Sequence, residues 1–362
     1  MKERRKKNMS RIGLLFMFCL LMLCGCAQIT GFMEKTEVSG RKVESLAAEK
    51  EDDTVLLGGM PVGIYMETDG VLVLDTEKMT GMDGKEYTPA HGVVSSGDYI
   101  TEVNHQKIEG KKQLMDLVEH LDGEKVLLTV RRENTILEKK LTPVQISKGN
   151  YRLGIWVRDN VQGLGTITFL TKNNRFAALG HGIHDIDTST LLTIKRGTLY
   201  RTSIQKVQKG SKGNPGTMEG IIVYNRFHQL GVIEKNTDAG IYGELNSDRS
   251  WIGEEVPIQV AKKEEIKTGE ARIRCYIDGE VKEYTICITQ IDKESDQVNK
   301  GMVIQVTDTE LLEKTGGIIQ GMSGSPIIQN GKLIGAVTHV FVQDSTKGYG
   351  IFIENMLKEE ES

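Results

Sequence analysis

Proline and long helical repeats are both scarce in this chain. Only 6 prolines occur in 362 residues, against 40 glycines, and no heptad repeat or long amphipathic stretch is present. A coiled coil is therefore excluded. The glycines lie between short runs of valine and isoleucine, which indicates a β-rich chain with many tight turns. Hydrophobic residues make up 38% and charged residues 27%, which excludes wholesale disorder and allows a globular core.

A basic stripe is also missing. Residues 1–11 carry a net charge of +5 while the whole chain carries −4, so the remaining residues carry −9. Nucleic-acid binding depends on clustered lysine and arginine side chains. The acidic body of the chain therefore argues against a nucleic-acid partner.

Only two of the five cysteines lie beyond the first 27 residues. These two, Cys275 and Cys287, belong to a stretch that predicts a β-hairpin turning near Asp278 and Gly279. In that register Cys275 faces a residue near Tyr284, so a disulfide between the two cysteines is allowed but not indicated. No CxxC pair typical of a zinc site is present.

Residues 1–27 have the layout of an export signal, with a basic start followed by the apolar run 12–27. This run is shorter than the roughly 20 residues of a relaxed membrane span. The run ends in Leu-Cys-Gly-Cys at Cys26, which resembles a lipoprotein cleavage box. Signal cleavage, lipidation and an uncleaved anchor stay open, and each predicts export across the cytoplasmic membrane. Residues 28–53 are charged and weakly patterned, which indicates a linker.

Residues 54–146 resemble a PDZ domain. The pattern A-x-G-x-x-x-x-G-D-x-I-x-x-V-N carries the resemblance, at Ala90, Gly92, Gly97, Asp98, Ile100, Val103 and Asn104. Apolar residues at positions 114, 117, 118 and 121 predict one amphipathic helix. PDZ domains add a peptide to a sheet edge and hold its terminal carboxylate with loop N–H groups. The predicted loop is "GGMPVGI", with the amides of Val62, Gly63 and Ile64.

Residues 151–358 contain more than ten short strand-like runs bounded by turn residues, which predicts a barrel or sandwich. Within them, "GMSGSP" is followed by an apolar strand, an Asn-Gly turn and a second apolar strand. This order resembles the nucleophile region of chymotrypsin-like serine proteases, with two departures at Met322 and Ser325. Ser323 is therefore the candidate nucleophile, and the N–H groups of Gly321 and Ser323 are candidate oxyanion donors.

A serine nucleophile needs a base and an acid that orients the base. The base candidates are the seven histidines, of which His181 stands out because a strand runs directly into Gly-His-Gly. The acid candidates are Asp308, Asp185 and Asp187, and the residues alone do not choose among them. Thr307 and Glu310 predict a capping box, so Asp308 has a second interpretation as a charge at the start of a helix.

The segment H-x-x-H-D-x-D, residues 181–187, offers a competing hypothesis of a metal-dependent hydrolase. Its spacing matches no zinc signature with a named third ligand. We therefore expect no metal and no cofactor.

The chain as a whole resembles the sporulation stage IV B serine peptidase (SpoIVB) family. The resemblance is carried from residue 54 onward by the PDZ-like segment, "ALGHGIHD", "KGSKGNPGTMEG", "AGIYG", "YIDGEVKEY" and "LLEKTGGIIQGMSGSPIIQNGKLIGAVTHV". It implies a mainly β protein in which a PDZ-like α+β domain precedes a barrel-like, loosely chymotrypsin-like peptidase domain. It also implies a triad of His181, Asp308 and Ser323.

The same resemblance implies partners and a location. The expected substrate is a membrane regulator of an intramembrane protease, whose cleavage leads to release of a late sporulation transcription factor from its precursor. Self-cleavage and membrane association are expected, and the expected location is the space between the forespore membranes. The alternative is a PDZ-based binding scaffold with an inactive protease domain.

Overall fold

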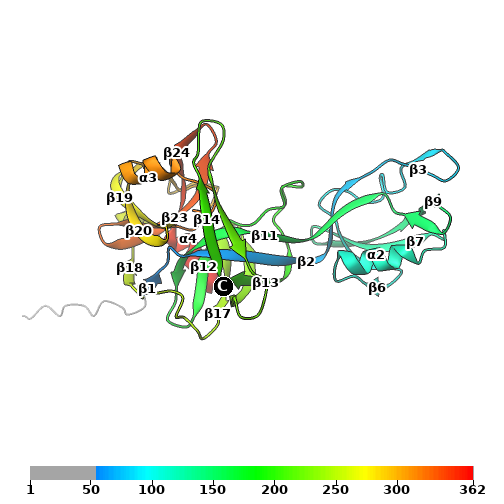
Figure 1. Cartoon of the computed structure of the whole chain (residues 1–362), viewed down its shortest axis with the longest axis horizontal. Helices are drawn as coiled ribbons and strands as arrows, with labels where there is room; N and C mark the ends of the chain where they lie inside the picture. The colour runs from blue at the N-terminus through cyan, green and yellow to red at the C-terminus, as the bar shows by residue number, and fades with distance from the viewer. Residues whose placement is uncertain (1–53, 362) are drawn as a thin grey trace, which may run out of the picture. The chain divides into compact units, whose positions relative to one another are not determined.

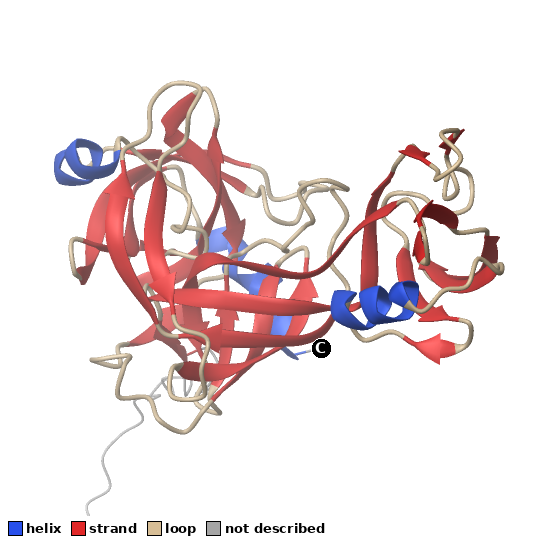
Figure 2. Cartoon of the chain, turned by 45° about the vertical axis from the view of Figure 1, so that its right-hand side comes forward, coloured by secondary structure: helices blue, strands red, loops and turns tan. Residues whose placement is uncertain are grey.

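The computed structural model describes residues 54–361, and β-strands dominate it (Figures 1 and 2). The expectation of a mainly β chain is confirmed. The predicted signal and linker lie outside the described residues. No helix within 54–361 is long and apolar enough to cross a membrane.

The first of two closed rings in the structure contains six strands. β2 (Pro61–Thr76), β11 (Ile155–Leu170), β12 (Arg175–Ala178), β17 (Gly240–Leu245), β16 (Gln229–Thr237) and β13 (Ile194–Tyr200) pair in that order, and β13 pairs back with β2. All six pairings are antiparallel. Apolar side chains from these strands, among them Met66, Ile167 and Ile241, fill the barrel. β14 (Thr202–Gln208) and β15 (Thr217–Ile222) form a separate hairpin.

The second half forms another ring of six antiparallel strands. β19 (Gly269–Ile277), β20 (Glu280–Ile291), β21 (Met302–Val306), β24 (Asp344–Phe352), β23 (Lys332–Phe341) and β22 (Pro326–Gln329) pair in that order, and β22 pairs back with β19. In β19, Ala271, Ile273, Cys275 and Ile277 alternate with more exposed residues and line the core, as the period of a strand requires. The predicted barrel-like region therefore consists of two barrels.

The two barrels share a third apolar cluster, which includes Leu57, Phe169, Leu333 and Met356. β1 (Thr54–Leu57) pairs with β11 of the first barrel and with β18 (Pro257–Val260), and β18 pairs with β23 of the second. Two helices complete this part, α3 (Thr309–Thr315) and the C-terminal α4 (Ile353–Glu361), together with a short 3-10 turn, Lys263–Glu265. The strand pairing and the shared core hold the two barrels together.

The PDZ-like domain is inserted between two neighbouring strands of the first barrel. β2 pairs with barrel strands as far as Thr68 and then pairs with β5 at Val71 and Leu72. β11 returns alongside β2 through both parts (Figure 1). The inserted elements are β3 (Met79–Thr80), β4 (Glu86–Tyr87), β5 (Tyr99–Val103), β6 (Gln106–Lys107), α2 (Lys111–Glu119), β7 (Val126–Arg132), β8 (Thr135–Leu141), β9 (Val144–Ser147) and β10 (Asn150–Arg152).

This topology corrects the predicted peptide-binding loop. Val62, Gly63 and Ile64 lie in β2, where they pair with β11 and the latter two also with β13. The side chains of Val62 and Ile64 are fully buried in the first barrel. A strand that lies between two partners has no N–H edge for a peptide carboxylate. The prediction was wrong because the Gly-rich run resembles a PDZ loop locally, whereas residues 54–68 are barrel strands.

The predictions of one amphipathic helix and of a hairpin turn are confirmed. The amphipathic helix is α2, whose Leu114 is buried against β7 and β5 residues in the PDZ-like core. The β19–β20 hairpin turns at Asp278 and Gly279, both with positive φ. Cys275 pairs with Lys282, two residues from the predicted position, and both cysteines are free thiols.

Candidate active site

The turn that carries Ser323 is tied to the first barrel although it belongs to the second. Thr166 of β11 donates its N–H to the Ser323 carbonyl at 2.9 Å and its hydroxyl to the Gly321 carbonyl at 2.8 Å. Thr168 donates its hydroxyl to the Gly324 carbonyl at 2.8 Å. A Cβ on Gly324 would lie 2.0 Å from the Thr166 carbonyl oxygen, so only glycine permits this approach. Ser323 is thereby placed where the barrels meet.

Two N–H groups in this turn are left for a ligand. The N–H groups of Met322, Gly324 and Ser325 each donate to a backbone carbonyl. Those of Gly321 and Ser323 have no backbone acceptor among residues 54–361. Gly321 has a φ of +101°, a conformation that favours glycine. The two predicted oxyanion donors are thus the two that the turn leaves without a backbone partner.

The hydroxyl of Ser323 is held by the neighbouring strand. Its Oγ donates to the Thr338 carbonyl of β23 at 2.8 Å. A rotation about χ1 would release the hydroxyl from this acceptor. To act as a nucleophile, Ser323 would therefore have to turn from this position toward a base.

His181 follows β12 through two residues with left-handed backbone, Leu179 and Gly180. Its Nδ1 lies 2.9 Å from the Gly182 carbonyl oxygen. A carbonyl only accepts, so this contact assigns the proton to Nδ1 and leaves Nε2 as the basic nitrogen. Burial lowers the pKa of His181, the Gly182 contact raises it, and the charge of His184 lowers it further.

A second imidazole packs against His181. The ring of His339 has its centroid 4.6 Å from that of His181, with 36° between the planes. Its Nδ1 is buried and has no hydrogen-bond partner among the described residues. Burial, followed by the charges of His181, Lys300 and His184, lowers the pKa of His339 to about 4. His339 is therefore neutral at neutral pH.

One cavity of about 370 Å³ brings these groups together. Ser323, Gly321, His181 and His339 all line it. Its apolar lining residues are Ile64, Val161, Leu164, Leu179, Ile183, Ile318, Ile319 and Val340. The other candidate bases, His91, His105, His120, His184 and His228, do not line it.

Asp308 is not among the residues that line this cavity. Its carboxylate caps α3, accepting the N–H of Leu311 at 3.1 Å through Oδ1 and the N–H of Thr285 at 3.1 Å through Oδ2. The predicted helix exists, but Asp308 rather than Thr307 is its N-cap. The structure therefore brings Ser323 and His181 to one cavity and leaves Asp308 at a helix end.

The other two acid candidates are bound elsewhere. Arg158 of β11 bridges the carboxylates of Asp185 and Asp187. Asp185 is buried and also accepts the N–H groups of Asp187 and Thr188. Residues 54–361 contain no group of three histidine, cysteine or acidic side chains that could hold a metal ion. The H-x-x-H-D-x-D segment is therefore a loop whose two aspartates bind Arg158.

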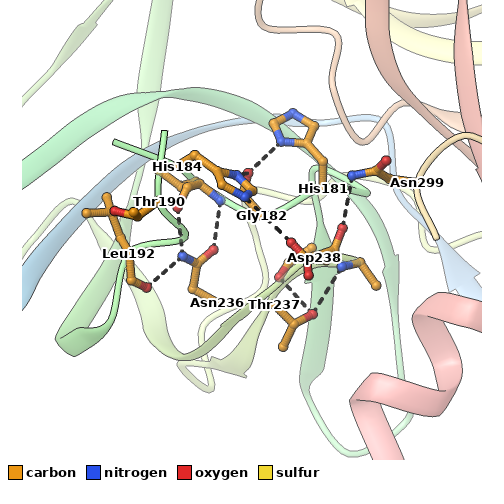
Figure 3. A network of polar contacts seen from close by, with 12 residues as sticks. His181, Gly182, His184, Thr190, Leu192, Asn236, Thr237, Asp238 and Asn299 are labelled. Atoms are coloured by element: carbon orange, nitrogen blue, oxygen red, sulfur yellow. Dashed lines mark hydrogen bonds and ion pairs between the residues drawn. The ribbon is translucent and has the colours of Figure 1, made fainter. Parts of the chain in front are cut away.

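A carboxylate that the sequence pattern does not single out lies near His184. Asp238, in the turn between β16 and β17, has its Oδ1 3.6 Å from His184 Nε2 (Figure 3). The Nδ1 atom of His184 lies 3.2 Å from the same Gly182 carbonyl that His181 contacts. Only the Thr-Asp-Ala-Gly turn between two apolar runs marks this residue in the sequence.

A second cavity, of about 480 Å³, lies between α2 and the chain that leads into β11. Met115 of α2 is 52% exposed there although it is apolar. Gly154 has a φ of +70° and lies between Leu153 and Ile155, directly before the start of β11. The other apolar side chains that line the cavity are Leu114, Val118 and Val157. The PDZ-like domain therefore has a partly apolar groove beside α2, lined by residues about 90 positions further along the chain than the loop predicted to bind a peptide.

Comparison with known proteins identifies the family. The family described as SpoIVB peptidase S55 matches residues 149–357, more than half of the chain. A protein of Helicobacter pylori (strain J99) described as a zinc metalloprotease is 28% identical over 181 residues. That match covers 43% of this chain and 50% of the relative, so the chain matches only half the length of that protein.

Several solved structures show a weaker likeness. The Rv3671c protease of M. tuberculosis in its active form is 16% identical, with a TM-score of 0.31, over 56% of this chain and 73% of that one. The HtrA-type protease AlgW with a decapeptide is 11% identical, with a TM-score of 0.33, over 56% and 53%. A PDZ domain of an SdrC-like protein of Listeria monocytogenes is 24% identical, with a TM-score of 0.20, over 25% and 87%.

The family match covers the second barrel and every strand of the first barrel except β2, and it includes the turn that holds Ser323 and the loop that holds His181. The chain belongs to the SpoIVB peptidase S55 family.

Proposed function

We propose that the protein is an exported serine endopeptidase in which Ser323 is the nucleophile and His181 the base. One observation carries the proposal: Ser323 and His181 line the same cavity as Gly321, and the N–H groups of Gly321 and Ser323 have no backbone acceptor within residues 54–361. Nucleophile, base and oxyanion donors are the parts that acyl transfer requires.

Catalysis begins when Ser323 turns away from the Thr338 carbonyl. Its hydroxyl proton passes to Nε2 of His181 while Oγ attacks the carbonyl carbon of the substrate peptide. The oxyanion that forms accepts hydrogen bonds from the N–H groups of Gly321 and Ser323. Each such donor accounts for about 10²- to 10³-fold in rate in enzymes of this kind.

The imidazolium then returns the proton. His181 protonates the leaving amine, the C–N bond breaks, and an acyl-enzyme remains on Ser323. Water then gives a proton to His181 while its oxygen bonds to the acyl carbon, the bond between that carbon and Oγ breaks, and His181 returns the proton to Ser323. The Gly182 carbonyl supports these steps because it holds Nδ1–H and keeps Nε2 available.

The groove beside α2 gives the protease a means to recruit protein substrates. Its apolar lining and its Leu-Gly-Ile entry suit an extended peptide that adds to β11 with its terminal carboxylate at Gly154. β11 lines this groove with Ile155 and the active-site cavity with Val161 and Leu164, so one strand connects the proposed recruitment site with the proposed cleavage site.

The family membership supports a role in sporulation signalling. In this role the enzyme cleaves a membrane regulator of an intramembrane protease, which then releases a transcription factor from its precursor, and it also cleaves itself. The basic and apolar residues 1–27 support export and membrane association, with action in the space between the forespore membranes.

Co-expression of the full chain with the candidate regulator tests this role. We expect shortened forms of both proteins, and neither form with Ser323→Ala. Unchanged cleavage of both proteins in the Ser323→Ala variant would remove the protease assignment to this serine. Labelling of Ser323 by a fluorophosphonate without cleavage of the regulator would keep the enzyme and reject this substrate.

A further inference from the structure

The β14–β15 hairpin lies between two strands of the first barrel in the chain, but it packs on the second barrel. It follows β13 and precedes β16. Its apolar residues Ile204, Val207 and Met218 pack against the core of the second barrel, and Met218 is buried. The end of the hairpin holds the segment "KGSKGNPGTMEG", residues 209–220, none of which lines the active-site cavity. Any effect of this segment on catalysis must therefore act through its neighbours.

The loop at the end of the hairpin, residues 209–216, is anchored to the second barrel through its backbone. The Gly210 N–H donates to the Thr315 carbonyl at the end of α3 at 2.8 Å. The Gly213 N–H donates to the Val342 carbonyl, in the turn between β23 and β24, at 2.9 Å. These bonds hold the end of the hairpin at one position relative to α3 and to the β23–β24 turn.

The start of β15 pairs with the residue that leads into the nucleophile turn. The Gln320 N–H donates to the Gly216 carbonyl at 2.8 Å, and the Met218 N–H donates to the Gln320 carbonyl at 2.9 Å. Together these two bonds form a parallel bridge between Thr217 and Gln320. β15 therefore fixes the peptide units on both sides of Gln320.

One of these two peptide units carries a proposed oxyanion donor. The peptide bond between Gln320 and Gly321 is planar and trans, so the Gln320 carbonyl and the Gly321 N–H point in opposite directions. The carbonyl is held by Met218, and Gly321 lines the active-site cavity. A flip of this peptide unit would remove the donor and break the bond to Met218. Because glycine tolerates either sign of φ, the chain at Gly321 does not itself prevent such a flip.

The second proposed donor does not depend on the hairpin. The Ser323 N–H shares a peptide unit with the Met322 carbonyl, which accepts the Ser325 N–H within the same turn at 2.9 Å. The Ser323 carbonyl accepts the N–H of Thr166 in the first barrel. The turn and β11 therefore fix the Ser323 donor, whereas β15 fixes the Gly321 donor.

We propose that the β14–β15 hairpin keeps the Gly321 N–H in place as an oxyanion donor, with Met218 as the positioning residue. The inference rests on the proposed roles of Ser323 and Gly321. While the Met218 N–H holds the Gln320 carbonyl, the Gly321 N–H faces the oxyanion as it forms. Without that bond the peptide unit turns freely, and one of the two donors is lost. Loss of one such donor lowers the rate about 10²- to 10³-fold in serine proteases.

The hairpin affects one of two quantities that the labelling of Ser323 reports. The plateau rate depends on the oxyanion donors, whereas the pH midpoint depends on His181. His181 contacts Gly182 and His339 rather than the hairpin. Loss of the bond from β15 therefore lowers the plateau and leaves the midpoint unchanged, whereas a displaced His181 would change both.

The test measures the rate constant for fluorophosphonate labelling of the full chain as a function of pH. Met218→Pro removes the N–H that Gln320 accepts and breaks no bond between β14 and β15, because this N–H points to Gln320. We expect its plateau rate to fall about 10²-fold or more with an unchanged midpoint. The matched control is Met218→Val, which has as many side-chain carbon atoms as proline but keeps the N–H. It should keep most of the wild-type rate.

An ester variant decides the test if thermal unfolding shows that Met218→Pro does not fold. In vitro translation with the α-hydroxy acid analogue of methionine replaces the peptide bond between Thr217 and Met218 by an ester, which deletes the same N–H and keeps the side chain. It should show the same fall in the plateau rate. A wild-type rate or a shifted midpoint in the folded variant overturns the inference, and so does an equal loss of rate in Met218→Val. Failure of the wild type itself to label would instead reject the proposed function.

Discussion

Acidification should weaken the fold through His339, and the size of the effect follows from its surroundings. The pKa of this ring falls from an ordinary value of 6.5 to about 4 in the folded protein, first because of burial and then because of the nearby charges. The unfolded chain therefore takes up a proton at a higher pH than the folded chain does. A difference of this size corresponds to about 3 kcal/mol.

The direction of this change in the free energy of unfolding follows from the two pKa values of His339. Above pH 6.5 both states are neutral at His339 and the group has no effect on the free energy of unfolding. Between pH 6.5 and about 4 only the unfolded state is protonated, so the free energy of unfolding falls as the pH falls. Partial solvent access to the ring should reduce the full effect to about 2 kcal/mol.

Urea unfolding at several pH values, for the wild type and for His339→Gln, measures this effect. The variant lacks the titrating group while the carboxylates are the same, so the difference between the two proteins isolates His339. We expect the variant to gain about 2 kcal/mol relative to the wild type between roughly pH 7 and pH 4. Parallel losses of stability in the two proteins over this range would refute the reasoning.

Three further predictions concern groups outside the active-site cavity. Asp308→Ala removes the cap of α3 and should lower the free energy of unfolding by about 1–2 kcal/mol, as measured by urea unfolding; no change would contradict the cap. Arg158→Met leaves the buried carboxylate of Asp185 without its ion-pair partner and should lower the free energy of unfolding by about 3 kcal/mol. Adding Asp185→Asn should recover most of this loss. Met115→Glu should weaken binding of a C-terminal peptide, measured by fluorescence anisotropy, without slowing the labelling of Ser323. Unchanged peptide binding would show that the groove beside α2 is not the peptide site.

The sequence predicted those features that neighbouring residues determine. The β19–β20 turn follows from Asp278-Gly279, which tolerates positive φ. α2 follows from the spacing of its apolar residues, and the Ser323 turn from its two glycines. Each of these features depends on a few consecutive residues, so the local sequence pattern is sufficient to predict it.

The features that were missed depend on contacts distant in the sequence. β2 runs from the barrel into the PDZ-like domain as one strand, so the Asp69-Gly70 pair beside Thr68 does not end a strand although its residue types are typical of a turn. The run at Val62–Ile64 therefore looked like the start of the inserted domain. Pairing with β11 and β13, about 100 residues or more later in the chain, assigns this run to the barrel.

The candidate site shows the same division. Ser323 and His181 could be chosen from their local patterns, because each lies in a glycine-flanked turn after or before a strand. Asp238 lies in an ordinary turn, and its position beside His184 depends on the packing of that turn against Gly182. Asp308 has two interpretations in the sequence, and its contacts with Thr285 and Leu311 favour the helix cap.

The most direct test of the account is the site at which a fluorophosphonate reacts. We predict that mass spectrometry of the labelled full chain finds the adduct on Ser323, and that His181→Ala abolishes it. Ser325→Ala is the matched control, since this buried serine in the same turn should not be needed for labelling. An adduct on another residue, or labelling of Ser323 that persists undiminished in His181→Ala, would contradict the central claim.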